Sequence, residues 1–324
     1  MKDQQNRKID YMRISITDRC NLRCVYCMPE EGIPCMKHEE ILSFEEIRRV
    51  AKAAWNLGVR KIKLTGGEPL VRKDIAHLIA ILRKEVHMEQ VTLTTNGVLL
   101  SQMAKELKDA GLTGVNISLD TLDKKRYEAI TRRDRINDVL NGMKECIAVG
   151  IPVKINCVPV REFNEDELLS IAELAKKYPV SVRFIEMMPI GYGKQYQPIS
   201  NDEILQLLEQ HYGKATVSTK RYGNGPAVYY EFKGFQKGIG FISAVSHEFC
   251  ENCNRVRLTS DGRLKLCLHH RDGIDLRELL RNGMEEEELT NVMEQAIMRK
   301  PISHQFFEKE IEDEETRAMV QIGG

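Results

Sequence analysis

Three cysteines near the start of the chain are spaced to hold a metal centre. Cys20, Cys24 and Cys27 form a C-x3-C-x2-C loop within RISITDRCNLRCVYCMPEEG. A structural zinc ion takes four ligands, whereas a cubane iron–sulfur cluster held by three cysteines keeps one iron open to a small molecule. The loop therefore predicts an iron–sulfur centre at which chemistry occurs, with a zinc knuckle as the alternative.

A second cysteine cluster lies near the other end of the chain, within FCENCNRVRLTSDGRLKLCL. Its members, in a C-x2-C-x13-C arrangement, are Cys250, Cys253 and Cys267. Two readings stay open, a second iron–sulfur centre and a zinc ribbon. The histidines that could complete a zinc site are His247, His269 and His270. Arg255 and Arg257 alternate beside the cluster, so both side chains can point toward one anion.

The remaining cysteines, Cys35, Cys146 and Cys157, receive no role. An odd total of nine cysteines argues against a disulfide framework and for metal-binding or catalytic thiols. Cys146 falls in a helical pattern and Cys157 in a strand, where we expect small buried hydrophobic residues.

Composition excludes several classes of protein. The 324 residues include 48 Lys and Arg against 48 Asp and Glu, so no global field attracts nucleic acid or an anionic membrane. A bound anion must instead be held by a local cluster of cations. With 42 % hydrophobic residues the chain can build a packed core. We find no apolar run long enough to span a bilayer, and the polar start MKDQQNRKID leads us to expect a cytosolic protein.

The elements that must position these cysteines alternate between strands and helices. The predicted strands cover residues 11–17, 61–65, 91–95, 115–119, 153–158 and 182–186. The predicted helices cover residues 43–58, 73–85, 100–111, 136–150 and 164–178. Ser43 and Glu46 form a capping-box pattern, and Gly58, Gly111 and Gly150 stand where a helix gives way to a strand.

This alternation predicts an α/β fold, an incomplete parallel barrel of six β/α units. In such a barrel the ligand groups gather at the carboxyl ends of the strands, where the cysteine and glycine motifs fall here. After about residue 213 the sequence becomes β-prone and punctuated by glycine. We therefore predict a barrel domain over residues 1–213 and a smaller domain over residues 214–324.

An aromatic residue, Tyr26, before the third cysteine and the turn TGGEP (65–69) after the second strand resemble the radical S-adenosylmethionine (SAM) superfamily. The resemblance implies a TIM-like partial barrel and a [4Fe-4S] cluster whose open iron chelates SAM. Reduction then cleaves SAM to methionine and a 5′-deoxyadenosyl radical. The residues implied to contact SAM are Tyr26, Gly67, Asn96, Ser118 and Met188.

Further motifs narrow the resemblance to the GTP 3′,8-cyclases that open molybdenum cofactor biosynthesis. They are KLTGGEPL, TLTTNG, NISLDTLD, VKIN, RFIEMMPIG, FCENCNRVRLTSDGRLKLCL and the terminal QIGG. What the family implies is a lyase that turns GTP into (8S)-3′,8-cyclo-7,8-dihydroguanosine 5′-triphosphate. In it the radical takes the ribose 3′ hydrogen and the carbon radical attacks guanine C8. The second cysteine cluster then carries another [4Fe-4S] cluster, whose open iron side binds guanine.

The family also implies substrate and catalytic residues. Those expected to contact GTP are Arg13, Lys63, Thr94, Lys154, Arg255, Val256 and Arg257, with Arg183 as an addition. Those expected to take part in catalysis are Arg255, Arg257, Gly323 and Gly324, because the Gly-Gly tail of the family enters the barrel mouth.

The expected partners are GTP, a flavodoxin or ferredoxin as electron donor, a second copy in a homodimer, and a downstream enzyme that takes the cyclic product. We expect no nucleic-acid or membrane partner. Two alternatives remain at this stage: another radical SAM enzyme with an auxiliary cluster, such as a peptide-modifying one, and a zinc-stabilised binding module.

Overall fold

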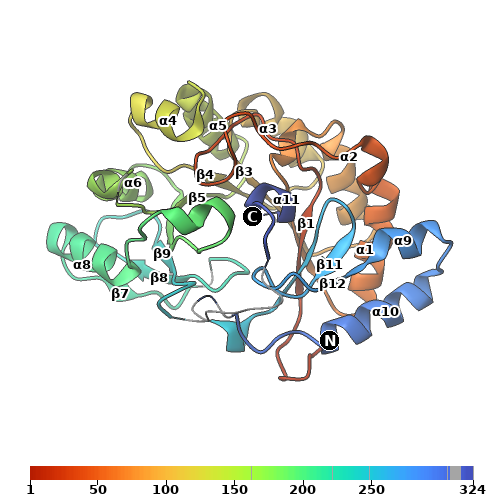
Figure 1. Cartoon of the computed structure of the whole chain (residues 1–324). Helices are drawn as coiled ribbons and strands as arrows, with labels where there is room; N and C mark the ends of the chain where they lie inside the picture. Colours follow the sequence, from red (N-terminus) through yellow and green to blue (C-terminus); the bar gives the residue numbers. More distant parts are fainter. Residues whose placement is uncertain (162, 221, 248, 305, 307–314, 324) are drawn as a thin grey trace.

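A single curved sheet forms the centre of the molecule, as Figure 1 shows. The computed structural model describes residues 1–161, 163–220, 222–247, 249–304, 306 and 315–323. Within these residues the sheet has twelve strands in the order β12-β11-β10-β1-β2-β3-β4-β5-β6-β9-β8-β7. The strands from β10 through β1–β6 to β9 run parallel, and the outer strands are antiparallel.

All six predicted strands are present in the predicted order, which confirms the incomplete parallel barrel. They are β1 (Tyr11–Ser15), β2 (Lys61–Thr65), β3 (Gln90–Thr95), β4 (Gly114–Ser118), β5 (Val153–Cys157) and β6 (Ser181–Ile185). Each neighbour pair is parallel and in register, with Arg13 opposite Lys63 and Asn116 opposite Lys154. Because side chains alternate along a strand, these polar residues share the concave face while residues such as Ile14 and Leu64 fill the core.

Helices cover the convex face of the sheet (Figure 1). They are α1 (Phe44–Asn56), α2 (Ile75–Ala80), α3 (Leu100–Asp109), α4 (Lys124–Thr131), α5 (Ile136–Ala148), α6 (Leu168–Ala172) and α7 (Leu174–Lys177). The capping box of α1 is confirmed: Ser43 Oγ accepts from the amide of Glu46 at 3.1 Å, and the Glu46 carboxylate accepts from the amide of Ser43 at 2.7 Å. Gly58, Gly111 and Gly150 take positive φ values where their helices end.

Two predicted helices differ in detail from the structure, and one helix between the predicted strands was not predicted. The predicted helix over residues 73–85 changes from α2 to a π-helical turn, η3 (Ile81–Glu85). The predicted helix over residues 164–178 is broken into a 3-10 turn, η4 (Glu165–Glu167), α6 and α7. Helix α4 is absent from the predicted set, since its short sequence KKRYEAIT carries only a weak apolar stripe.

The part of the chain after residue 213 extends both edges of the six-stranded sheet. Strand β9 (Ile239–Ile242) pairs with β6, and β10 (Arg255–Leu258) pairs with β1. The remaining strands are β7 (Thr216–Val217), β8 (Val228–Glu231), β11 (Arg263–Lys265) and β12 (Gly273–Asp275). The remaining α-helices are α8 (Asn201–Tyr212), α9 (Leu276–Arg281), α10 (Glu286–Met298) and α11 (Met319–Ile322). The domain boundary at residue 213 stays a prediction.

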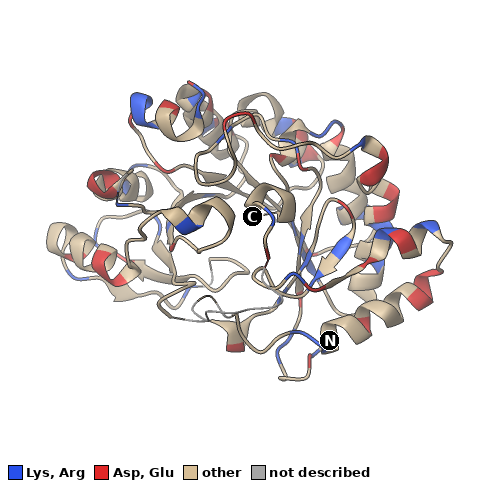
Figure 2. Cartoon of the chain, viewed as in Figure 1, with Lys and Arg blue, Asp and Glu red and all other residues tan. Residues whose placement is uncertain are grey.

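Charge is spread evenly over the outside of the molecule. Figure 2 shows basic and acidic residues interspersed on the outer helices, in line with the formal charge of zero. None of the helices in the described residues is long and apolar enough to cross a membrane.

Candidate active site

A cavity of about 300 Å³ opens at the carboxyl ends of the parallel strands. Its lining includes residues that follow β1, β4, β5 and β6 and residues of the second cysteine cluster. Most of the predicted site residues line it together: Arg13, Tyr26, Cys27, Lys63, Thr94, Ser118, Met188, Cys250, Cys253, Arg255, Arg257 and Cys267. The two cysteine clusters, 223 residues apart at Cys27 and Cys250, thus face one space.

Hydrogen bonds attach the first cysteine loop to α4 and to the sheet. The amides of Arg23 and Val25 donate to the carbonyls of Thr131 and Ile130, each at 3.0 Å. Burial raises the pKa of Cys24, and the neighbouring thiols of Cys27 and Cys20 raise it further. The Cys24 thiol is therefore within electrostatic range of the other two cysteines of the loop.

Tyr26 in this loop is tied to the end of β4. Its hydroxyl donates to Asp120 Oδ2 at 2.5 Å, and Asp120 Oδ1 accepts from the amide of Val158 at 2.8 Å. Burial raises the pKa of the Asp120 carboxyl. Burial and the charge of Asp120 raise the pKa of the Tyr26 hydroxyl. Asp120 lines the cavity and was missed from sequence, although it stands two residues after Ser118 in the motif NISLDTLD.

The TGGEP turn (65–69) packs against the start of the first cysteine loop. A Cβ atom on Gly67 would lie 2.4 Å from the carbonyl oxygen of Arg19, so only glycine allows this approach. The carboxylate of Glu68, to which the sequence analysis gives no role, accepts hydrogen bonds from Thr95 Oγ1 and from the amide of Asn96, both at 2.7 Å. Burial raises the pKa of Glu68 to about 7 despite these hydrogen bonds. Asn96 Nδ2 lies 4.0 Å from Cys20 Sγ and donates to Asn21 at 2.7 Å.

The second cysteine site is assembled by a hairpin. Strands β10 and β11 pair Arg257 with Lys265, so the segments at their open end, with Cys253 and Cys267, return to one place. Burial alone would raise the pKa of Cys253, but the charges of Lys300 and Arg255 outweigh it and bring the pKa to about 6. The lowered pKa favours the thiolate form of Cys253, which is the form that ligates metal.

Basic side chains line the concave face of the sheet, in the cavity of the cysteine sites and in the adjoining one. They are Arg13, Lys63, Lys154, Arg183, Arg255 and Arg257. Burial lowers the pKa of Lys63, and Arg183, Arg13, Lys154 and Arg255 lower it further. None of the ion pairs among the described residues involves these six cations. Lys63, Arg183 and Arg257 are buried, and like charges gathered without acidic partners favour the binding of an anionic ligand.

The C-terminal tail enters this space. Figure 1 shows α11 and the C-terminus at the middle of the molecule. Val320 packs with Met28 and against Cys20 and Cys27, and Met319 lines the cavity. The carbonyl of Gly323 accepts from Arg257 Nη1 at 2.8 Å. Gly324 lies outside the described residues.

Some predicted contacts do not reach the main cavity. Lys154 lines an adjoining cavity of about 800 Å³ at the other end of the strands, which shares Arg13, Lys63 and Arg183 with the first. Val256 is fully buried in the core and lines neither cavity. The other predicted residues outside both linings are Cys20, Cys24, Gly67, Asn96 and Gly323.

Comparison with known proteins identifies the family. Residues 14–175 match the model of the radical SAM superfamily, and residues 180–306 match the model named Molybdenum Cofactor Synthesis C. A GTP 3′,8-cyclase of Clostridium perfringens (strain SM101) is 45 % identical over 324 residues, covering 100 % of both chains. Another, of Desulforamulus reducens, is 46 % identical over 330 residues with the same coverage. This chain belongs to the GTP 3′,8-cyclase family.

Membership of the GTP 3′,8-cyclase family makes the chain a radical SAM enzyme of molybdenum cofactor biosynthesis. It decides against the zinc-stabilised binding module and the peptide-modifying enzyme. A crystal structure of Streptococcus suis SuiB bound to S-adenosylmethionine resembles the fold, with a TM-score of 0.61 and 16 % identity. That comparison covers 88 % of this chain and 68 % of SuiB, and it supports the radical SAM architecture.

The donor set of the first cysteine loop fits the [4Fe-4S] cluster that the superfamily implies. All nine cysteines are free thiols, and the amide of Leu22 donates to Cys20 Sγ at 3.4 Å. In the described ranges no three His, Cys, Asp or Glu side chains stand close enough to hold one metal ion directly. Three cysteines in one short loop, with N–H donors aimed at Cys20 Sγ, match the ligand type of a site-differentiated cluster.

Proposed function

We propose that this chain converts GTP into (8S)-3′,8-cyclo-7,8-dihydroguanosine 5′-triphosphate, the first step of molybdenum cofactor biosynthesis. The observation that carries the proposal is the group of cations on the concave face beside the two cysteine sites, which have no acidic ion-pair partner among the described residues. One end of the substrate would lie by the first site, where SAM is cleaved, and a polyanionic tail would lie among the cations. The product is an isomer of GTP, because the hydrogen atom taken from C3′ is balanced by an electron and a proton returned to the guanine.

In this proposal the triphosphate lies on the concave face of the sheet. Arg13, Lys63 and Arg257 share one level of the sheet, because β1 pairs Arg13 with both neighbours. Lys154 and Arg183 approach from β5 and β6. Guanidinium groups give bidentate hydrogen bonds to phosphate oxygens, and the lysines add point charges. Thr94, with its hydroxyl 3.4 Å from Asn116 Nδ2, offers a neutral contact.

SAM would lie at the first cysteine loop. The contacts come from Tyr26, Ser118 and Met188 in the cavity, with Gly67 and Asn96 bracing the loop. When bound there, the [4Fe-4S] cluster supplies the electron that cleaves SAM and generates the radical that starts the reaction. Tyr26 and Asp120 orient the loop.

A second [4Fe-4S] cluster at Cys250, Cys253 and Cys267 is part of the proposal. The depressed pKa of Cys253 and the proximity of Lys300 and Arg255 support thiolate ligation there. The cluster would face the cavity and hold the guanine base, while Arg255 and Arg257 contact the substrate. Gly323 and Gly324 would close the same space as catalytic elements of the tail.

The proposal extends to partners. We expect a flavodoxin or ferredoxin as the electron donor, a homodimer, a downstream enzyme that takes the cyclic product, and a cytosolic location. None of these partners is needed for the test of the reaction itself, because a chemical reductant replaces the electron donor.

Anaerobic incubation of the reconstituted protein with GTP, SAM and dithionite tests the proposed reaction. Mass analysis is expected to find 5′-deoxyadenosine and an isomer of GTP in equal amounts. Protein in which Cys24 is replaced by serine should form neither product. Deoxyadenosine without a GTP isomer, under conditions where both clusters are intact, would contradict the proposed substrate.

A further inference from the structure

A buried arginine near the N-terminus joins the first ten residues to the second cysteine site. Asp3 and Arg7 belong to a small hairpin that turns at Asn6, whose φ is +60°. The Arg7 side chain is 3 % exposed, and its Nε donates to Asp3 Oδ2 at 2.6 Å. A buried charge is costly unless it is fully bonded, so the acceptors of this guanidinium are informative.

The guanidinium of Arg7 donates to four backbone carbonyls outside its own hairpin. The acceptors are the oxygens of Cys250 (3.1 Å), Lys300 (3.1 Å), Pro301 (2.7 Å) and Ile302 (2.9 Å). Gln5 Oε1 at 3.0 Å completes the set. Only the planar fork of arginine reaches so many acceptors at once, since a lysine has one nitrogen.

Arg7 contacts two segments, one at Cys250 and one at residues 300–302, and both help to form the second cysteine site. Cys250 is the first cysteine of that site, and Lys300 lies in the same cavity as the three thiols. The Lys300 ammonium donates to the carbonyl of Leu266, the residue before Cys267. Arg7 therefore connects the segment of Cys250 with that of Cys267 through Lys300.

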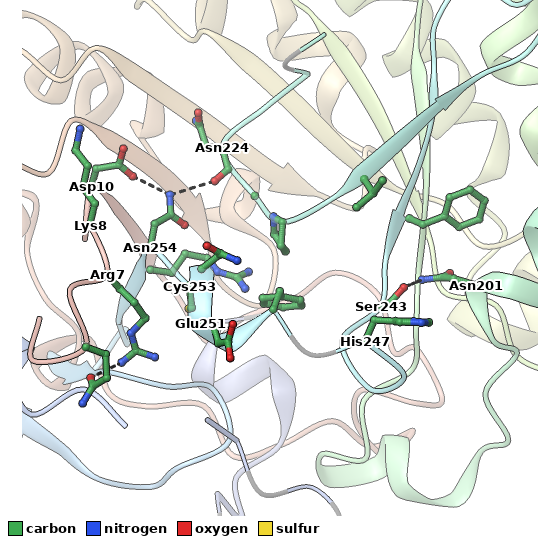
Figure 3. Close-up of a pocket in the computed structure, with 18 of the residues that line it drawn as sticks. Arg7, Lys8, Asp10, Asn201, Asn224, Ser243, His247, Glu251, Cys253 and Asn254 are labelled. Carbon is green, nitrogen blue, oxygen red and sulfur yellow. Dashed lines mark hydrogen bonds between the residues drawn. The ribbon is translucent and has the colours of Figure 1, made fainter. Parts of the chain in front are cut away.

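The N-terminal segment also holds the far end of the C-x2-C loop. Asn254 Nδ2 donates to Asp10 Oδ1 at 2.7 Å and to the carbonyl of Asn224 at 3.3 Å. Figure 3 shows Asn254 between Asp10 and Asn224, with Arg7 and Cys253 beside the same pocket of about 810 Å³. Arg7 is bonded to Cys250 and Asp10 to Asn254, so the two residues hold the loop on both sides of Cys253.

We propose that Arg7, fixed by Asp3, is a positioning residue for the second metal site, and that residues 3–10 act as a clamp that sets the geometry of the loop 250–254 and of Lys300. The inference rests on the proposed second cluster. The first cysteine site is held by α4 and by Asn96, with no bond to the clamp among the described residues. Loss of the clamp should therefore act on one cluster and spare the other.

The test replaces Arg7 by lysine, which keeps the charge and removes the fork. Arg48→Lys is the matched control, because Arg48 makes a partly exposed ion pair with Glu45 on α1. Cys250→Ser is the reference for a lost second site. Iron and sulfide per chain are measured after anaerobic reconstitution, together with the electron paramagnetic resonance spectrum with and without SAM.

We expect Arg7→Lys to lose about half of the iron and sulfide and to keep the spectral change on SAM binding, and we expect the same of Cys250→Ser. Arg48→Lys should match the wild type. Full iron content and an unchanged spectrum in Arg7→Lys would overturn the clamp, as would loss of both clusters together, which marks general unfolding. If Cys250→Ser itself loses no iron, the proposed second cluster fails instead, and the clamp with it.

Discussion

The Arg257 guanidinium donates a hydrogen bond to the carbonyl oxygen of Gly323, 2.8 Å away, and so fastens the end of the chain to a strand of the sheet. Gly323 has a φ of +74°, and a Cβ atom there would lie 2.7 Å from Ser15 Cβ and 2.9 Å from Thr65 Oγ1. The tail can pack this closely against the ends of β1 and β2 only because Gly323 has no side chain.

Gly323→Ala is expected to displace the tail. The left-handed conformation alone costs an L-residue about 1–2 kcal/mol, and the clash with Ser15 adds to it. Because Arg257 then loses its acceptor, formation of the GTP isomer should fall by more than about tenfold. Cleavage of SAM should continue. The two products are measured separately in one anaerobic reaction.

The control for that variant is Gly283→Ala. Gly283 has a φ of +86°, and a Cβ atom there meets nothing within 4 Å. This variant should lose about 1–2 kcal/mol of stability and keep both products. An equal loss of the GTP isomer in both variants would refute a local role for Gly323.

The sequence predicts the elements better than the contacts between them. Strand β1 and the capping box at Ser43 are local patterns, and the structure confirms them. The bond between Tyr26 and Asp120 spans 94 residues, and that between Arg7 and Cys250 spans 243. Such contacts depend on how the strands are ordered, which spacing along the chain does not encode.

Tyr26→Phe tests the bond that orients the first cysteine loop. Among the described residues, the change leaves the buried carboxylate of Asp120 with only the amide of Val158 as donor. Losing the partner of a buried acceptor costs about 1–3 kcal/mol, so the affinity for SAM should fall about tenfold. Equilibrium binding of SAM to the reconstituted enzyme measures the effect. Tyr192→Phe, at a hydroxyl on a 41 % exposed residue, should bind SAM like the wild type.

The pKa of Lys154 makes phosphate binding dependent on pH. Burial and then the charge of Arg183 lower this pKa to about 8. The ammonium form prevails below pH 8 and is lost above it, so the affinity for GTP should weaken by up to about tenfold per pH unit as the pH rises past 8. Lys154→Arg should remove this decline, because arginine stays charged. Guanosine, which has no phosphate, is the control ligand; a decline of equal slope for guanosine would contradict the assignment.

The buried carboxyl of Glu68 should lower the stability of the enzyme as the pH rises. Burial raises its pKa from 4.5 to about 7, so between these values the folded state binds the proton that the unfolded state has lost. The free energy of unfolding contributed by this group is therefore greatest below pH 4.5 and falls as the pH rises to 7, by about 3 kcal/mol in all. Glu68→Gln, which is neutral throughout, should lack that decline. Urea unfolding of both proteins at pH 5 and pH 8 gives the comparison, and an equal pH dependence in the two would show that Glu68 is ionised in the folded protein at both.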